Sequence, residues 1–444
     1  MKSINTNTMS NRIFIGIATV LLAWNTQAQE VLALDQAIAA SLEHNHNLKI
    51  AELSSQQAAN AATMGNAGML PNVVATAGAN VSQQNSNLEF ATGQTQDVEG
   101  AQSMSQNMSL GISQTLFAGG RIQRSYALLK TAEQSASLAE QQAMETTIAM
   151  VWSQYTGLAL LQRSVVTAQQ VLFFSSQRYE RAMLTNSLGG SNTTERLSAE
   201  VDLNRDSINL LEVQAQYQLA KNSFATYIGW ENSDFLVDES GITDAINATD
   251  LPDDLLANLR ENNSALLLAQ TSVNAASLQE KLQQSTLFPT IAAQASYGLN
   301  QSQAEAGFLT ASQQQGLNAG ISLQYNLFSG FQSKTQRQNA ALEVLKAQEQ
   351  LDQVSETLEN TLANAMDVFN NAIKIAAIET KNMEVAERRL MRMSELHALG
   401  KASSLELREA QIAWLNANNG MYSAQFQAAN AKITVLALVG SLGR

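Results

Sequence analysis

Apolar and polar residues alternate at period two in four short stretches of the chain, and this alternation predicts β-strands. The first stretch follows Pro71 and the third follows Pro289, and in both the apolar side chains occupy every second position. A strand tolerates proline at its start, because the missing N–H breaks no ladder hydrogen bond there. We expect Pro71 and Pro289 to mark strand starts. The expected strands cover about 72–82, 106–117, 290–300 and 317–328.

The segments between paired strands are polar. Residues 83–104 and 301–316 are rich in Gln, Ser, Asn and Gly. Such clusters are typical of loops, so we expect both segments to form exposed hairpin tips.

A helical period dominates the stretches that follow each strand pair. Residues 332–399 contain no Gly or Pro, and residues 121–188 contain only Gly157. An uninterrupted helix of that length extends about 100 Å at 1.5 Å per residue. Apolar residues in these stretches step by threes and fours, which indicates coiled-coil seams. A compact globular domain has no room for such helices.

The order of helix, strand pair, long helix and second long helix occurs twice. Leu-Phe-Ala-Gly at 116–119 recurs as Leu-Phe-Ser-Gly at 327–330, each time at the exit from a strand pair. Repeated patterns of this kind indicate repeated structural units. We expect a first structural repeat over 29–229, an irregular equatorial segment over 230–250, and a second repeat over 251–444.

Residues 1–28 are typical of a cleaved secretory signal peptide. Lys2 and Arg12 precede an apolar run over 13–24, and small residues up to Ala28 offer a cleavage point. That run is too short for a permanent membrane helix, and no later run approaches the roughly 20 residues that spanning needs. If the mature chain lies in a membrane, we expect a β-barrel. The alternative is a soluble periplasmic protein.

Four strands cannot close a barrel alone, because about eight is the practical minimum in a bilayer. Open sheet edges are not tolerated in hydrocarbon, so copies of the chain must pool their strands. Two copies supply eight strands and three supply twelve. Three copies also allow a ring of long helices around an open bore. The competing interpretation is an amphipathic sheet on a soluble protein.

The composition and net charge exclude some kinds of chemistry and argue against one class of partner. The chain has no cysteine, which excludes disulfides and thiolate catalysis. The formal net charge of −13 becomes −13 − 2 = −15 when Lys2 and Arg12 leave with the signal peptide. This acidic balance argues against a nucleic-acid partner.

No catalytic, cofactor or metal site is predicted. His44, His46 and His397 are the three histidines, and the first two point to different sides of a helix. The glycines at 119–120 follow a strand but lack the Lys-Ser/Thr continuation of a phosphate-binding loop. We therefore expect no enzyme activity, and energy for any transport must come from a partner.

Over nearly the whole mature chain, these features resemble the TolC-type outer-membrane efflux and secretion channels, the outer membrane factors. The resemblance rests on the duplication, the proline-led strands, the Leu-Phe exits into helix and the glycine-containing turns. It implies a mainly α-helical homotrimer, in which a twelve-stranded membrane β-barrel continues into a coiled-coil helical tunnel through the periplasm. It also implies passive efflux or type I protein secretion when the tunnel docks to a periplasmic adaptor and an inner-membrane transporter of RND or ABC type.

The tunnel tips, where partners dock, are expected at the helix-to-helix turns 186–193 and 397–404. In both turns a glycine can end one helix at positive φ, and Ser or Thr can cap the next helix. The residues expected in these turns and in docking are Gly189, Gly190, Ser191, Thr193, His397, Gly400, Lys401 and Ser403.

The resemblance also implies an acidic pair that faces the bore, and Glu406 and Glu409 occupy those positions. They lie three residues apart on one helix face. In a trimer, six such carboxylates near the constriction would repel anions and attract cations. The alternative is that both side chains lie on a solvated outer face.

Two positions depart from the family pattern for a closed tunnel. Where the family often has an Arg and a Tyr that hold the tunnel shut, this chain has Ala402 and His397. Closure must then use other contacts. The candidates by position are Lys401, Arg408, Glu195 and Arg196.

A second function hypothesis is a periplasmic coiled-coil adaptor or structural protein without a pore. The two hypotheses differ in conductance, because only a channel gives defined current steps in a planar bilayer. The membrane-length alternation, present four times, favours the channel.

Overall fold

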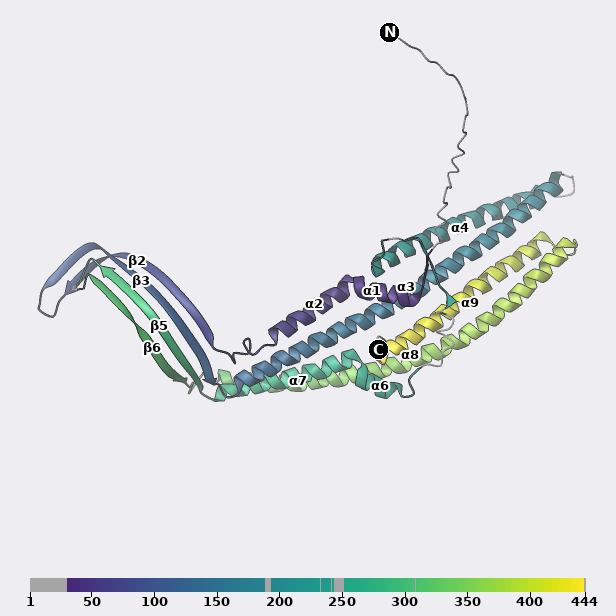
Figure 1. The fold of residues 1–444 in the computed structure, drawn as a ribbon. Coiled ribbons are helices and arrows are strands. Elements are labelled where there is room, and N and C mark those ends of the chain that lie inside the picture. Colours follow the sequence, from purple (N-terminus) through teal and green to yellow (C-terminus); the bar gives the residue numbers. More distant parts are fainter. Residues whose placement is uncertain are drawn as a thin grey trace, which may run out of the picture.

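The molecule is elongated, with an antiparallel sheet at one end and two long helical hairpins at the other (Figure 1). This computed structural model describes residues 30–187, 193–231, 233–240, 242, 251–307 and 309–442. The predicted signal peptide over 1–28 lies outside the described residues. The prediction of a mainly helical chain with antiparallel strands is confirmed.

The two halves of the chain repeat one order of elements. The first half contains β1 (Glu30–Leu32), α1 (Leu34–His44), α2 (His46–Ala61), β2 (Asn72–Glu89), β3 (Thr95–Phe117), α3 (Arg121–Ser187) and α4 (Thr193–Ile228). The second half contains β4 (Phe235–Val237), α6 (Leu255–Asn262), α7 (Ser264–Gln284), the 3-10 helix η1 (Ser285–Leu287), β5 (Thr290–Ala304), β6 (Ala311–Gln324), α8 (Gln332–Ala398) and α9 (Ser404–Leu438). The run from α2 to α4 corresponds element by element to the run from α7 to α9.

The long strands form one four-stranded sheet in the order β2-β3-β5-β6, with every neighbouring pair antiparallel. β2 begins directly after Pro71 and β5 directly after Pro289. Strands from the two halves meet in the middle of the sheet, where β3 pairs with β5. β2 and β6 are left as edge strands with one unpaired side each.

The strands are longer than the alternation predicted. β2 continues to Glu89 and β3 starts at Thr95, so most of the expected loop 83–104 is paired strand. The expected tip 301–316 is likewise mostly strand, and β6 ends at Gln324, before the expected 328. The prediction of long loops was wrong because alternation reports an apolar face, whereas the ladder is made by backbone groups and continues where both faces are polar.

Helices α3 and α8 are 67 residues long each and run away from the sheet. α4 and α9 return along them, so that α3/α4 and α8/α9 form two antiparallel hairpins (Figure 1). The shorter helices α2 and α7 pack on α3 and α8 near the sheet. Within the described residues, no helix combines the length and the apolar composition needed to cross a membrane.

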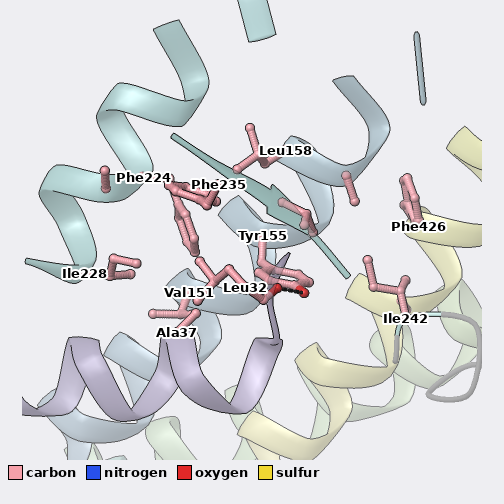
Figure 2. Packing of buried hydrophobic residues seen from close by; sticks show 14 residues of the cluster. Leu32, Ala37, Val151, Tyr155, Leu158, Phe224, Ile228, Phe235, Ile242 and Phe426 are labelled. Atoms are coloured by element: carbon pink, nitrogen blue, oxygen red, sulfur yellow. Dashed lines mark hydrogen bonds between the residues drawn. The ribbon is translucent and has the colours of Figure 1, made fainter. Parts of the chain in front are cut away.

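A hydrophobic cluster lies where α1, α3, α4 and β4 meet, and we call it the waist (Figure 2). Its larger buried side chains include Leu32, Tyr155, Phe224 and Phe235. The hydroxyl of Tyr155 donates to the carbonyl oxygens of Leu32 and Asp238, each at 2.8 Å. Burial raises the pKa of Tyr155 above its usual range. The segment 230–250 was expected to be irregular, yet its described part contains β4, which pairs in parallel with β1. The start of the described chain is therefore anchored at the waist.

Candidate functional site

The turn between α8 and α9 reverses the chain at the helical end of the molecule. Gly400 has φ +70°, and the N–H of Lys401 donates to the carbonyl oxygen of Leu396 at 2.8 Å. Only a residue that tolerates the left-handed region ends a helix in this way, which explains the glycine. Lys401 is exposed beside it.

Ser403 caps the start of α9. Its hydroxyl oxygen accepts the N–H of Glu406 at 3.2 Å, and its own N–H donates to the Glu406 carboxylate at 2.7 Å. These reciprocal bonds form a capping box, which satisfies two N–H groups that the helix itself cannot pair. The hydrogen bonds from Ser403 lower the pKa of the Glu406 carboxyl below its usual range.

His397 and Ala402 contact each other across this turn. Nδ1 of His397 lies 3.0 Å from the carbonyl oxygen of Ala402. At these two positions the sequence resemblance led us to expect a departure from the family pattern. The His397 side chain therefore contacts the backbone of its own turn.

Glu406 and Glu409 are both exposed on the first turns of α9. The residues between them face inward, because Leu407 and Arg408 are buried against the rest of the molecule. The two carboxylates therefore lie on the side of α9 that points away from its packed face. In the part of the chain that the structure describes, no ion pair involves Glu409.

The other predicted tip is described only in part. Gly189, Gly190 and Ser191 lie outside the described residues, and Thr193 is the exposed first residue of α4. Of the positional candidates, Arg196 pairs with Glu200 one turn further along the same helix at 3.1 Å. This pair lies within α4 and links no two helices.

Arg408 makes a buried connection between three helices. Its Nη2 lies 2.8 Å from Oδ1 of Asp206 on α4, and its Nη1 lies 3.3 Å from the Ser175 hydroxyl oxygen on α3. The Ser175 hydroxyl in turn donates to Asp206. The side chains of Arg408 and Asp206 are only 8% and 10% exposed. We call these three residues the buried polar cluster.

A second ion pair lies close to this cluster. Nη2 of Arg178 on α3 and Oδ2 of Asp202 on α4 are 2.6 Å apart. Arg178 comes three residues after Ser175, and Asp202 comes four before Asp206, so both pairs join the same stretches of α3 and α4. The α3/α4 hairpin is therefore held by charge at its buried seam.

Arg408 was a candidate from its position in the sequence, but its partners Asp206 and Ser175 were not predicted. Asp206 lies seven residues after the buried Ala199, and Ser175 lies four after the buried Val171, so both occupy seam positions of their helices. The sequence did contain a signal for these partners, because a charged or hydroxyl residue occupies a position in an otherwise apolar helix seam. It indicates a specific partner on the facing helix, because an unpaired buried charge is strongly unfavourable.

A groove of about 660 Å³ opens between α3, α8 and α9 close to the tips. Its walls include Phe174, Trp414 and His397, and the rings of Phe174 and Trp414 meet edge to face with centroids 6.2 Å apart. The groove separates the two helical hairpins on one side. Among the described residues, no three His, Cys, Asp or Glu side chains converge to hold a metal ion.

Comparisons with known proteins identify the family and support the fold. The family described as "Outer membrane efflux protein" matches residues 19–230 and 255–441. No curated protein sequence matches the chain. The fold is similar to that of solved outer-membrane channels at low sequence identity.

Three of these structures cover almost the whole chain. The Campylobacter jejuni CmeC outer membrane channel has a TM-score of 0.77 at 15% identity, covering 99% of this chain and 94% of that one. The Vibrio cholerae outer membrane protein VceC has a TM-score of 0.71 at 16% identity, covering 92% and 96%. The open state of the Neisseria gonorrhoeae MtrE outer membrane channel has a TM-score of 0.71 at 20% identity, covering 92% and 89%. The matched family spans most of the chain, and the chain belongs to the outer membrane efflux protein family.

Proposed function

We propose that three copies of this chain form one passive duct through the outer membrane and the periplasm. The observation that carries the proposal is the four-stranded sheet with the two unpaired edges of β2 and β6. An open edge cannot lie in hydrocarbon, and a closed ring of three such sheets removes every edge. Twelve strands also suit a barrel wide enough for a water-filled lumen.

The helices support the same assembly. In a single copy, α4 and α8 expose apolar side chains along much of their length. Those on α4 are Leu197, Val201, Ile208, Leu211 and Leu219, and those on α8 include Val368, Ile375, Ile378 and Val385. Apolar stripes on long helices are buried by neighbouring helices in coiled coils. We infer that neighbouring copies cover them and complete a coiled-coil tunnel.

Glu406 and Glu409 supply the charge of the tunnel entrance in this proposal. Both carboxylates are exposed on the first turns of α9, at the end of the molecule opposite the sheet. In the trimer, six carboxylates around a narrow opening favour cations over anions. The duct itself supplies no energy, and the direction of transport comes from the partner that docks at the tips.

The partners proposed for the tips are a periplasmic adaptor and an inner-membrane transporter of the RND or ABC type. The exposure of the turn residues Gly400, Lys401 and Ser403 supports this proposal. The transporter determines whether the cargo is a small molecule or a secreted protein. A photo-crosslinking residue at Lys401 in living cells, followed by identification of the attached protein, tests this contact.

Conductance decides between the duct and a pore-free adaptor or structural protein. Purified full-length protein added to a planar lipid bilayer is expected to give defined current steps, and chemical crosslinking in detergent is expected to give a trimer. A monomer that gives no current steps contradicts the proposal and favours the pore-free alternative.

A further inference from the structure

The register of the sheet sorts its side chains onto two different faces. One face carries apolar residues in lateral rows, and we call it the apolar face. Two of its rows are Val73–Ile112–Ala295–Ala319 and Ala75–Leu110–Tyr297–Leu317. The opposite face, the polar face, carries neutral polar residues and glycine. One of its rows is Thr76–Ser109–Gly298–Gly316.

Charge is absent from most of the sheet. The four long strands contain no Lys or Arg, and their acidic residues are Glu89, Asp97 and Glu99. All three lie at the end of the β2–β3 hairpin that is remote from the helices, and Glu305 follows β5 at the same end. A charged side chain on a lipid-facing strand is destabilising, most of all at the bilayer midplane. The uncharged section is therefore the part of the sheet suited to hydrocarbon.

A row of glutamines interrupts the apolar face. The face also holds two single glutamines, Gln114 and Gln315, and each has a hydrogen-bond partner within the chain. Ala79, Gln106, Gln301 and Gln313 lie side by side in register across the four strands. A carboxamide is unfavourable in hydrocarbon unless it finds a hydrogen-bond partner, which water and lipid headgroups supply. This glutamine row thus has the chemistry of a membrane surface.

The other limit of the apolar face is aromatic. Its last apolar pair is Ile291 with Leu323. Beyond this pair, at the junction with the helices, Phe288, Phe328 and Phe331 are exposed. Exposed aromatic side chains form girdles at the water interfaces of membrane barrels.

The distance between the two limits matches a bilayer. From Ile291 to Gln301 the strand advances 301 − 291 = 10 residues. At about 3.3 Å per residue this is about 33 Å along the strand. A tilt of about 45° reduces it to a height of about 23 Å, close to the apolar band of about 25 Å in outer-membrane barrels.

The two hairpins extend unequally past the glutamine row. β2 runs on for 89 − 79 = 10 residues, whereas β5 runs on for only 304 − 301 = 3. In this outer part the side chains on both sides of the β2–β3 hairpin are mostly polar, as the paired residues Gln83 and Gln102 show. The hydrogen-bond ladder nevertheless continues to the pair Glu89–Thr95.

We propose that the hydrocarbon of the outer membrane covers the apolar face only from the Ile291–Leu323 pair to the glutamine row, and that the outer part of the β2–β3 hairpin stands in water beyond it. The inference rests on the proposed function and adds where the bilayer ends. It also explains why the alternation of apolar and polar residues ends before β2 and β3 do. A strand in lipid needs an apolar outer face, whereas a strand in water does not. Each trimer then carries three paired ribbons outside the membrane, each with an acidic end.

The chain contains no cysteine, so single cysteines along one strand can report the boundary. Leu110→Cys and Met104→Cys both lie on the apolar face of β3, on opposite sides of Gln106. Full-length variants are spin-labelled and reconstituted in phospholipid vesicles, and collision rates with oxygen and with a water-soluble nickel chelate are measured. Ser109→Cys, on the polar face beside Leu110, is the matched control.

The label at Leu110 is expected to collide mainly with oxygen, and the label at Met104 mainly with the chelate. Met104 decides the inference, because it is apolar and hydropathy alone places it in lipid. Preferential collision of the Met104 label with oxygen overturns the boundary but leaves the membrane duct intact. Preferential collision of the Leu110 label with the chelate, as at Ser109, overturns the duct itself.

Discussion

Arg408 of α9 and Asp206 of α4 form a buried ion pair, with Nη2 and Oδ1 2.8 Å apart. The pair joins the α8/α9 hairpin to the α3/α4 hairpin, and Ser175 of α3 completes the contact. Arg408 lies between Glu406 and Glu409 in the chain. Its burial holds the packed side of α9 against the other helices, and the two carboxylates consequently remain on the side of α9 that is exposed in a single copy.

Breaking this pair is expected to destabilise the helical end of the molecule. Asp206→Leu leaves the guanidinium of Arg408 buried without its partner, and losing one member of such a pair costs about 3–5 kcal/mol. The double variant Asp206→Leu/Arg408→Leu removes both charges and is expected to lose much less. The measurement is the midpoint temperature of the helical circular-dichroism signal in detergent.

Arg196→Ala is the control for this series, because its pair with Glu200 is partly exposed and lies within α4. Pairs of this kind contribute about 0.3–0.5 kcal/mol, so little change is expected. A double variant as unstable as the single one contradicts the assignment of the loss to an unpaired charge.

The charge of Glu406 and Glu409 is expected to set ion preference. Glu409→Gln and Glu406→Gln remove one carboxylate each with little change of shape, and both are expected to reduce the permeability of cations relative to anions. The measurement is the reversal potential of a single channel in a salt gradient. Glu52→Gln removes one charge from α2, near the sheet end of the helices, and is expected to leave the potential unchanged. Unchanged potentials in both tip variants place these residues outside the bore.

The cation selectivity of the channel is expected to depend on pH through the Glu406 carboxylate, which belongs to the capping box. Hydrogen bonds from Ser403 lower the pKa of Glu406 below the ordinary value of 4.5. Because the folded pKa is depressed, the stability that these hydrogen bonds give the cap is complete above pH 4.5 and is lost as pH falls through the folded pKa. In a Glu409→Gln background, Ser403→Ala removes the hydroxyl but keeps the backbone N–H, which makes the larger contribution, so a small shift of the loss of cation preference to higher pH is expected. An identical pH profile with and without the Ser403 hydroxyl contradicts the role of that hydroxyl.

Tyr155→Phe is expected to loosen the waist. It removes the hydroxyl that donates to the carbonyl oxygens of Leu32 and Asp238, and an unsatisfied buried polar group costs about 1–3 kcal/mol. Faster amide hydrogen exchange in β1 and β4 is the measurement. Burial raises the pKa of Tyr155 above the ordinary 10.0, so its contribution is complete below pH 10 and declines as pH rises through the folded value. Tyr179→Phe on the same helix is the control, and equal exchange in both variants contradicts the anchor.

Gly400→Ala tests backbone conformation at the tip. The glycine has φ +70°, and no atom lies within 4 Å of an added Cβ, so the only cost is the left-handed conformation, about 1–2 kcal/mol. Asn tolerates this region better than Ala, so Gly400→Asn is expected to lose less. Thermal midpoints rank the variants, and a Gly400→Asn midpoint at or below that of Gly400→Ala contradicts the conformational explanation.

Local periodicity by itself predicted much of this protein. Period-two alternation after Pro71 and Pro289 located the starts of β2 and β5, and the two long stretches that contain no Pro and at most one Gly correspond to α3 and α8. These features follow from sequence because a strand or helix is specified by its own side chains and their spacing. The glycine and serine of the second tip turn are likewise local signals, and Gly400 and Ser403 end and cap the helices there.

Only the tertiary structure decided which distant residues meet. The pairing of β3 with β5, the anchoring of β1 on β4, and the contact of Arg408 with Asp206 join positions far apart in the chain. The outer part of the β2–β3 hairpin was also missed, because its backbone ladder needs no side-chain pattern. Periodicity describes which side of an element is apolar, whereas partners and strand length depend on backbone hydrogen bonds and on packing between elements, which no local window contains.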